Sequence, residues 1–290
     1  MSHPTTQKPS SQLLRISHGH PASDGAGVQL TRYIGMSDWP DLDPFLMLDA
    51  FASENPDDYM AGFPPHPHRG FETVTYLLHG RMRHRDNLGN EGVLEAGGIQ
   101  WMTAGRGVIH SEMPEQENGL LQGFQLWLNL PAHAKMTPPA YQDFPPDAIP
   151  LEVRDNGTRI RVISGQTDQG TVGVIHNPYV HPTYLDVTLP PHSDFHQAWQ
   201  NGQQGFILML EGQLLFDHGQ TALKTGQLAQ LRPPQAHEDG LQCRAAEDGA
   251  RFLLVTATPL QEAIARGGPF VMNTQAEIQQ AFDDYRHGRF

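Results

Sequence analysis

The chain has 290 residues and carries 19 Lys and Arg against 32 Asp and Glu, which gives a formal net charge of −13. That length favours about two domains. The acidic balance, with no basic run of five or more residues, excludes the clustered cations with which proteins bind a nucleic-acid backbone. We therefore expect no direct nucleic-acid partner.

The first residues of the chain carry no targeting signal that we can identify. Residues 1–14 are polar and lack the apolar core of a signal peptide. No stretch approaches the roughly 18 consecutive apolar residues of a membrane-spanning helix. The single cysteine, Cys243, has no second cysteine in the chain to pair with. We expect a cytoplasmic protein with no membrane partner and no internal disulfide.

Short apolar runs rich in β-branched and aromatic residues follow one another along the chain. Several alternate between apolar and polar side chains, and 29 Gly and 24 Pro punctuate them. Many short strands separated by such turns are typical of a β-sandwich or barrel. We predict an all-β fold whose strands include residues 73–78, 124–128, 159–163, 184–189, 206–210 and 252–256.

A weak internal repeat indicates two copies of one β-domain. The segment VTYLLHGRM around Gly80 and the segment FILMLEGQL around Gly212 share an apolar strand, a turn glycine and a resumed strand. A histidine follows further along each copy, His110 in the first and His237 in the second. Two copies favour two barrels in tandem rather than a solenoid, which needs more repeats.

A proline-rich segment separates the two copies. Residues 131–150 contain six prolines, and such a run is compatible neither with a regular helix nor with a central strand. We interpret it as an ordered linker. The sequence therefore predicts an N-terminal domain over residues 1–138 and a C-terminal domain over residues 139–290.

The end of the sequence predicts one short helix. Thr274 and Glu277 have the spacing of a capping box. The apolar residues Ile278, Ala281, Phe282 and Tyr285 then follow the spacing of one buried helical face. We expect a helix that packs on a barrel and takes no part in chemistry.

Two short segments carry the candidate metal ligands. In FPPHPHRGFE, His66 and His68 lie two residues apart at the start of a predicted strand. Side chains at this spacing point to the same side of an extended chain, so the two imidazoles can meet at one point. His110 and Glu112 in GRGVIHSE repeat the spacing with an imidazole and a carboxylate.

The donor atoms of these segments indicate the kind of metal. If the segments form neighbouring strands, three imidazoles and one carboxylate converge. Such a set suits a first-row divalent metal, whereas Ca²⁺ and Mg²⁺ prefer oxygen ligands. Four protein ligands leave two positions of an octahedral shell open, as iron oxygenases need. Spacing alone leaves Glu72 as an alternative carboxylate ligand.

The motifs resemble those of the cupin superfamily and, more closely, of the pirin family. His66, His68, Glu72 and Gly80 fit the first cupin motif, with the glycine one residue late, and the stretch from Gly107 to His110 fits the second. The segments PHPHRGFETVTYLL, QWMTAGRGVIHSEMP, QLWLNLP, KMTPPAYQD and GPFVMNTQAEIQQAFDDYRHGRF are similar to pirin.

The resemblance implies two cupin barrels in tandem, followed by the short C-terminal helix. It implies one metal per chain in the N-terminal barrel, with His66, His68, His110 and Glu112 as ligands. The expected metal is Fe²⁺, with Ni, Cu, Co, Mn or Zn as substitutes. The general cupin pattern would use Glu72, whereas the pirin pattern makes Glu72 a neighbour of the site or a packing residue.

The second copy lacks the ligand pair of the first. The offsets that separate His66 and His68 from Gly80 fall on Ala198 and Gln200 when they are counted from Gly212. Neither residue can replace an imidazole pair, and His237 stands alone. We predict that the C-terminal barrel is a degenerate cupin without metal.

The pirin resemblance implies a dioxygenase that opens a flavonol such as quercetin with O2, and Glu112 as the general base. The substrate class would be a small aromatic molecule. The alternative is a non-enzymatic, iron-dependent protein that binds a transcription factor or a metabolic enzyme. A zinc-dependent isomerase is a third class with the same fold. Oxygen uptake with a flavonol would separate the first class from the other two.

Overall fold

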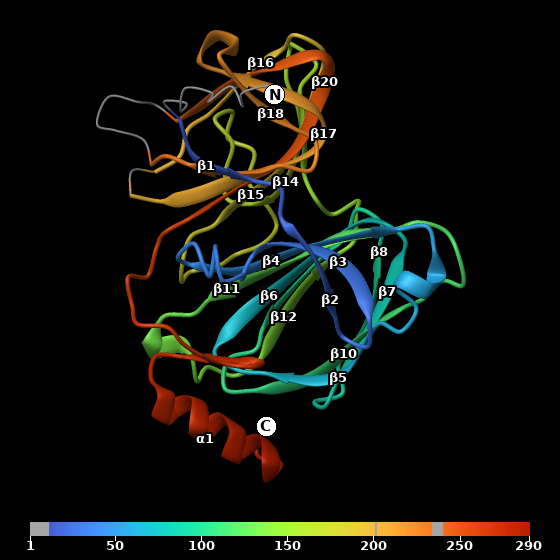
Figure 1. Cartoon of the computed structure of the whole chain (residues 1–290), viewed down its shortest axis with the longest axis vertical. Helices are drawn as coiled ribbons and strands as arrows, with labels where there is room; N and C mark the ends of the chain where they lie inside the picture. The colour runs from blue at the N-terminus through green and yellow to red at the C-terminus, as the bar shows by residue number, and fades with distance from the viewer. Residues whose placement is uncertain (1–11, 201, 234–239) are drawn as a thin grey trace, which may run out of the picture. The chain divides into compact units, whose positions relative to one another are not determined.

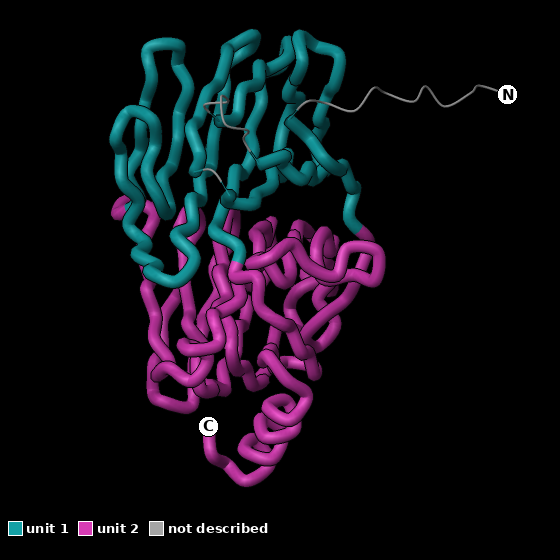
Figure 2. The backbone as a smooth tube through the Cα atoms, turned by 90° about the vertical axis from the view of Figure 1, so that its left-hand side faces the viewer, with its two compact units in different colours: residues 1–19, 149–259 teal, residues 20–148, 260–290 magenta. Residues whose placement is uncertain are grey.

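The computed structural model describes residues 12–200, 202–233 and 240–290, so the predicted counterpart histidine His237 lies outside the described part of the chain. The chain forms two compact units, each assembled from two separate segments (Figure 2). Unit 1 comprises Met1–Gly19 and Ile149–Pro259, and unit 2 comprises His20–Ala148 and Leu260–Phe290. Within the described ranges no helix is long and apolar enough to cross a membrane.

Unit 2 contains a seven-stranded sheet, a four-stranded sheet and a two-stranded sheet (Figure 1). The order in the first is β12-β9-β6-β11-β4-β3-β2, the order in the second is β5-β10-β7-β8, and the third pairs β21 with β22. The strands are β2 (His20–Asp24), β3 (Val28–Ile34), β4 (Phe45–Ser53), β5 (Phe63–His68), β6 (Phe71–His79), β7 (Arg81–Asp86), β8 (Glu91–Glu95), β9 (Ile99–Thr103), β10 (Val108–Pro114), β11 (Leu121–Asn129), β12 (Ala140–Phe144), β21 (Ala265–Gly267) and β22 (Phe270–Met272). Short 3-10 turns η1 (Pro56–Asp58) and η2 (Ala132–Ala134) and helix α1 (Gln275–Arg286) complete the unit.

Unit 1 is built around one nine-stranded sheet. Its main order is β1-β19-β17-β20-β15-β14-β13, while β16 pairs with β20 and β18 pairs with β17. The strands are β1 (Leu13–Ser17), β13 (Leu151–Val153), β14 (Arg159–Ser164), β15 (Thr183–Leu189), β16 (Asp194–Gln197), β17 (Gln204–Phe216), β18 (Thr221–Lys224), β19 (Leu228–Leu231) and β20 (Leu241–Ala257), with the 3-10 turn η3 (Asp217–Gly219).

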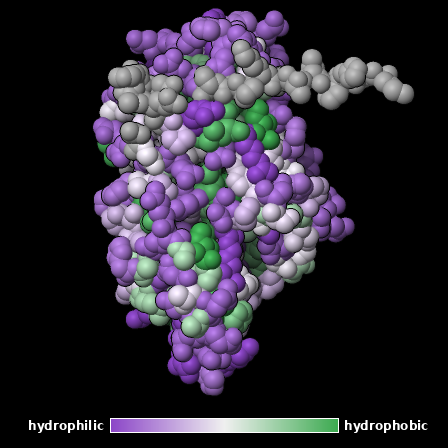
Figure 3. All heavy atoms as spheres, turned by 60° about the vertical axis from the view of Figure 1, so that its left-hand side comes forward, coloured by the Kyte–Doolittle hydropathy of each residue, from purple (hydrophilic) through white to green (hydrophobic). Residues whose placement is uncertain are grey.

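Each unit has a hydrophobic core that follows the alternation of its strands. In unit 1, residues two apart on β15, β17 and β20 turn to the same side, and pairs such as Leu185 with Val187 and Phe252 with Leu254 are buried in one cluster. Burial of each such side chain contributes about 1.5–3 kcal/mol before the entropy of folding is counted. The face drawn in Figure 3 is mostly hydrophilic, with hydrophobic residues in limited patches, in keeping with the acidic composition.

The predicted fold class is confirmed, because the regular structure of the described chain consists of strands, three short 3-10 turns and a single short α-helix at its end. The helix begins at the predicted place. The Thr274 side chain accepts a hydrogen bond from the Glu277 backbone, and the Glu277 side chain completes the capping box. Ile278 and Ala281 are buried as expected, but Tyr285 is 40 % exposed.

The division into units differs from the predicted boundary between residues 138 and 139. Strand β12 lies beyond that boundary, yet it pairs with β9, with Ala140 opposite Thr103. Strand β12 is an edge strand, which agrees with its proline-rich flanks. At the start of the chain, β1 pairs with β19, with Ile16 opposite Ala229, and therefore belongs to unit 1.

Candidate metal centre

Strands β5 and β10 bring the predicted histidines together. Strand β5 is an edge strand of the four-stranded sheet. Its residues Pro64, Pro65 and Pro67 lack a backbone N–H, which an edge strand tolerates because it is hydrogen-bonded on one side only. It pairs antiparallel with β10, with His110 opposite His66. The alternation of β5 turns His68 to the same side as His66. The two short motifs thus become a single site through one strand pair.

The three imidazoles form a compact group. The ring centroids of His66 and His110 lie 4.5 Å apart, those of His66 and His68 lie 4.7 Å apart, and those of His68 and His110 lie 5.1 Å apart. One ligand atom from each ring lies within 4.8 Å of the other two. Among the described residues this is the only group of three or more His, Cys, Asp or Glu side chains with such geometry.

Burial favours the uncharged form of two of these imidazoles, those of His68 and His110. Burial, followed by the neighbouring His110 and His66, holds the pKa of His68 well below its ordinary value. Burial, followed by His66 and His84, does the same for the pKa of His110. A neutral imidazole keeps the lone pair that a metal needs.

The hydrogen bonding of the rings fits a metal ion. The Nδ1 atom of His66 lies 2.8 Å from the Pro64 carbonyl, to which it can only donate, and this leaves the lone pair of His66 on Nε2. That Nε2 lies 3.0 Å from Nε2 of His68. Two nitrogen ligands at right angles on bonds of about 2.1 Å are separated by about 3 Å. Neither ring nitrogen of His110 has a hydrogen-bond partner among the described residues, although His110 is only 1 % exposed.

Glu112 is buried near this group but is held by other side chains. One carboxylate oxygen accepts a hydrogen bond from Thr75 Oγ1 at 2.9 Å, and the other accepts one from Gln125 Nε2 at 2.8 Å. The carboxylate lies outside the set of mutually close ligand atoms formed by the three histidines. Each carboxylate oxygen has two lone pairs, so both contacts leave an acceptor free for a metal.

Glu72 lies on β6 and turns away from Glu112. Thr75 of the same strand contacts Glu112, and residues three apart on a strand point to opposite faces. The Glu72 carboxylate instead accepts a hydrogen bond from Thr103 Oγ1 at 2.7 Å. Phe71, on the same face as Thr75, packs with its ring centroid 5.0 Å from that of His68.

A cavity of about 640 Å³ opens beside His66 and His68. Its walls combine apolar and aromatic surface with a few polar groups, as small-molecule sites commonly do. The lining includes His66, His68, Phe63, Met47, Trp127 and Gln125. Two arginines also line it, of which Arg32 is paired with Asp49 at 2.6 Å.

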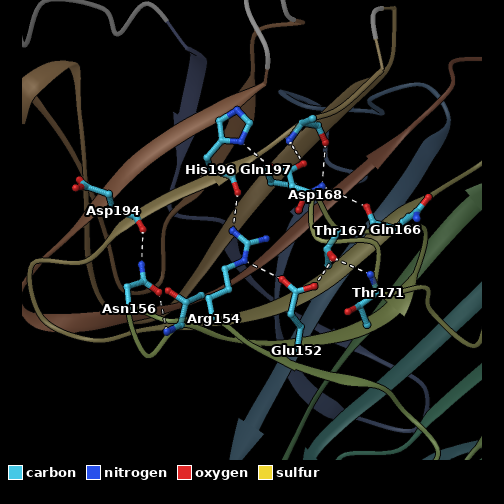
Figure 4. A network of polar contacts seen from close by, with 12 residues as sticks. Glu152, Arg154, Asn156, Gln166, Thr167, Asp168, Thr171, Asp194, His196 and Gln197 are labelled. Atoms are coloured by element: carbon cyan, nitrogen blue, oxygen red, sulfur yellow. Dashed lines mark hydrogen bonds and ion pairs between the residues drawn. The ribbon is translucent and has the colours of Figure 1, made fainter.

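Unit 1 has a polar network where the repeat would place a second metal site (Figure 4). Asp168 accepts a hydrogen bond from the backbone of Ala198 at 2.7 Å, and its other oxygen lies 2.5 Å from His196 Nδ1. Arg154 donates to the His196 carbonyl and to Glu152, both at 2.8 Å. The network consists of paired polar groups rather than converging imidazoles.

Comparison with known proteins decides the family. The pirin family matches residues 27–128, and the pirin C-terminal cupin domain matches residues 184–290. The chain belongs to the pirin family. Among curated relatives, a pirin-like protein of Caulobacter vibrioides is 48 % identical, with 96 % of this chain and 98 % of the relative covered. The comparison thus supports two cupin domains in this chain, although residues 260–290, which fall within the match to the C-terminal cupin domain, belong to unit 2.

Two solved structures extend the comparison. A quercetin 2,3-dioxygenase from Acinetobacter baumannii has a TM-score of 0.85 and 32 % identity, with 96 % of this pirin and 98 % of that chain covered. The bacterial pirin YhhW from Escherichia coli, in complex with nickel(II), has a TM-score of 0.63 and 19 % identity, with 84 % of this pirin and 99 % of that chain covered. At that identity the second structure shows the shared fold alone.

The sequence patterns missed the residues that hold Glu112 in place. Thr75 and Gln125 lie on β6 and β11, within the segments PHPHRGFETVTYLL and QLWLNLP, but the sequence patterns assigned neither residue a role at the site. The one usable signal was the strand alternation, which puts Thr75 and Phe71 on one face of β6.

Proposed function

We propose that this pirin is an iron-dependent dioxygenase that opens a flavonol such as quercetin with O2 and releases carbon monoxide. The observation that carries the proposal is the group of three imidazoles, two of which line a cavity with aromatic walls. The similarity to a structure named as a quercetin 2,3-dioxygenase supports the substrate class.

We propose His66, His68, His110 and Glu112 as the ligands of one divalent metal. The intrinsic affinity order of such sites favours Cu, Ni and Zn over Fe²⁺, and availability in the cell favours iron. Recombinant protein is therefore expected to carry some Ni or Zn. When bound, the metal would supply open positions for the flavonol oxygen and O2.

The protein side chains supply orientation and a proton acceptor. Phe63 and Trp127 line the cavity and offer flat apolar surface to the rings of a flavonol. Glu112 would take the proton of the flavonol 3-hydroxyl. Thr75 and Gln125 orient its carboxylate, and each carboxylate oxygen keeps a lone pair that can accept the proton. The apolar wall would keep water from the opened ring.

The test uses the full chain reconstituted with Fe²⁺ without oxygen. Quercetin and O2 are then added, and oxygen uptake and carbon monoxide are measured together. We expect both in equal amounts, well above free Fe²⁺ and above the metal-free protein. Oxygen uptake no greater than that of free Fe²⁺ would contradict the proposal. So would an activity that requires Zn²⁺ and does not depend on Fe²⁺.

A further inference from the structure

Arg69, the residue that follows His68, joins three parts of unit 2. Its guanidinium donates from Nε to the Arg106 carbonyl and from Nη1 to Asp284 of α1 at 2.7 Å. The Arg69 side chain is only 3 % exposed. The hydrogen bond from Arg69 lowers the pKa of Asp284 to about 2, so this pair is ionised at neutral pH. One buried cation thus links the end of β5, the approach to β10 and the C-terminal helix.

The backbone beside Arg69 is also fixed by the C-terminal segment. The Val271 amide donates to the Arg69 carbonyl at 3.0 Å. The buried Lys135 ammonium donates to the carbonyls of Gly70 and Val271, at 2.8 and 3.0 Å. The chain just after the His66–His68 pair is therefore bonded to β22 rather than to a further strand of its own sheet.

The approach to His110 meets the same segment. The Phe290 ring lies under Arg69, with its centroid 4.3 Å from the guanidinium carbon. A Cβ atom at Gly107 would stand 2.8 Å from that ring. Asn87 accepts a hydrogen bond from the Ile109 amide at 2.9 Å and donates to the Phe290 carbonyl at 3.3 Å.

Strand β5 needs such support because β10 is its only partner in the sheet. The ladder between β10 and β5 also shifts register between His110 and Glu112. An edge strand that is bonded on one side only can move relative to its partner strand. Such a movement of β5 would change the distances from His66 and His68 to His110. Contacts behind a ligand set its orientation and are known to tune metal affinity.

We propose that the C-terminal segment 269–290 is a clamp that fixes the distance between the two histidine-bearing strands, with Arg69 and Asp284 as its positioning residues. The clamp rests on the proposed metal site but not on flavonol chemistry. In this proposal α1 and Phe290 contribute to metal binding as well as to the packing of unit 2.

The matched pair Asp284→Asn and Asp283→Asn tests this clamp. Each variant removes one negative charge from the same turn of α1. The Asp283 side chain is 47 % exposed, and it forms an ion pair with Arg286 at 3.3 Å rather than with Arg69. Co²⁺ serves as the probe in the full chain. The absorption bands at saturating Co²⁺ report the ligand arrangement, and competition with a chelator reports the dissociation rate.

We expect Asp284→Asn to shift the Co²⁺ bands and to release Co²⁺ roughly ten- to a hundredfold faster, while Asp283→Asn matches the parent protein. Asp284→Glu, which keeps the charge, should recover most of the slow release. If Asp284→Asn does not fold, Phe290→Ala provides the same comparison without touching the ion pair.

Bands and release rates that are unchanged in both Asp284→Asn and Phe290→Ala would overturn the clamp. A parent protein that binds no Co²⁺ would overturn the metal site and the clamp together. Failure of quercetin oxidation, with the Co²⁺ results as expected, would contradict only the proposed function. The two proposals can therefore fail separately.

Discussion

At the scale of single residues, Glu112 and Glu72 show how strand geometry separates two similar carboxylates. Both are buried, at 3 % and 2 % exposed. Glu112 shares a strand with His110 and is oriented by Thr75 and Gln125. Glu72 lies on the other face of β6, where its carboxylate accepts a hydrogen bond from Thr103 of β9. The spacing of the motifs did not distinguish the two carboxylates, whereas the strand faces on which they lie are different.

This difference predicts opposite results for two conservative substitutions. Glu112→Gln keeps an oxygen donor and nearly the same volume but removes the basic group. We expect it to retain much of its metal and to lose flavonol cleavage by about 10²–10⁴-fold. Glu72→Gln should retain the metal and most of the activity. Elemental analysis and oxygen uptake on both variants provide the measurements.

The reverse pattern would be informative. Metal lost from Glu72→Gln, with full metal and full activity in Glu112→Gln, would mean that the general cupin arrangement holds and that Glu72 is the carboxylate ligand.

At the scale of elements, the local patterns predicted what local geometry decides. The spacing of His66 and His68 put both on one side of a strand, and the Thr274–Glu277 box fixed the start of α1. The partners of β1 and β12 did not follow from the sequence. Pairing of β1 with β19 spans most of the chain, and such pairing depends on tertiary packing rather than on any local period.

The contact between the β5–β6 turn and β22 can be tested with two glycines. Gly70 and Gly89 have nearly the same backbone angle, with φ of +89° and +90°. A Cβ at Gly70 would stand 2.0 Å from the Val271 carbonyl oxygen, whereas a Cβ at Gly89 would meet nothing within 4 Å. Both alanine variants lose about 1–2 kcal/mol to the left-handed backbone.

We expect Gly70→Ala to lose a further 1–3 kcal/mol, roughly, through the clash with the Val271 carbonyl. Chemical denaturation of both variants measures the difference in the free energy of unfolding. Equal losses would show that β22 moves aside freely, which would also weaken the case for a fixed C-terminal segment.

At the scale of the whole molecule, the candidate metal centre lies in one unit, and the described residues of the other unit contain no comparable group of ligands. The repeat predicted two related barrels, and the family comparison supports both. The sequence alone predicted that the second copy lacks the histidine pair, because the corresponding offsets from its turn glycine fall on Ala198 and Gln200. What counting could not supply is the polar network around Asp168 and Arg154, because its members come from separate strands and loops.

We therefore predict one tightly bound metal per chain. Elemental analysis of the purified protein should approach one equivalent, and the variants His66→Ala, His68→Ala and His110→Ala should each lose it. Two equivalents that dissociate independently would mean that unit 1 contains a metal site that its described residues do not indicate.

The discontinuous make-up of unit 2 has a consequence for its biosynthesis. The strands that bear His66, His68 and His110 emerge from the ribosome before residues 260–290, which belong to the same unit. About 150 residues separate His110 from that segment, and at about 5–20 residues per second they take roughly 8 to 30 seconds to translate. During this interval the nascent chain holds all three imidazoles without β22 or α1 behind them. If the C-terminal segment stabilises the metal site as proposed, we expect metal captured in this interval to exchange readily and the finished chain to determine which metal is retained.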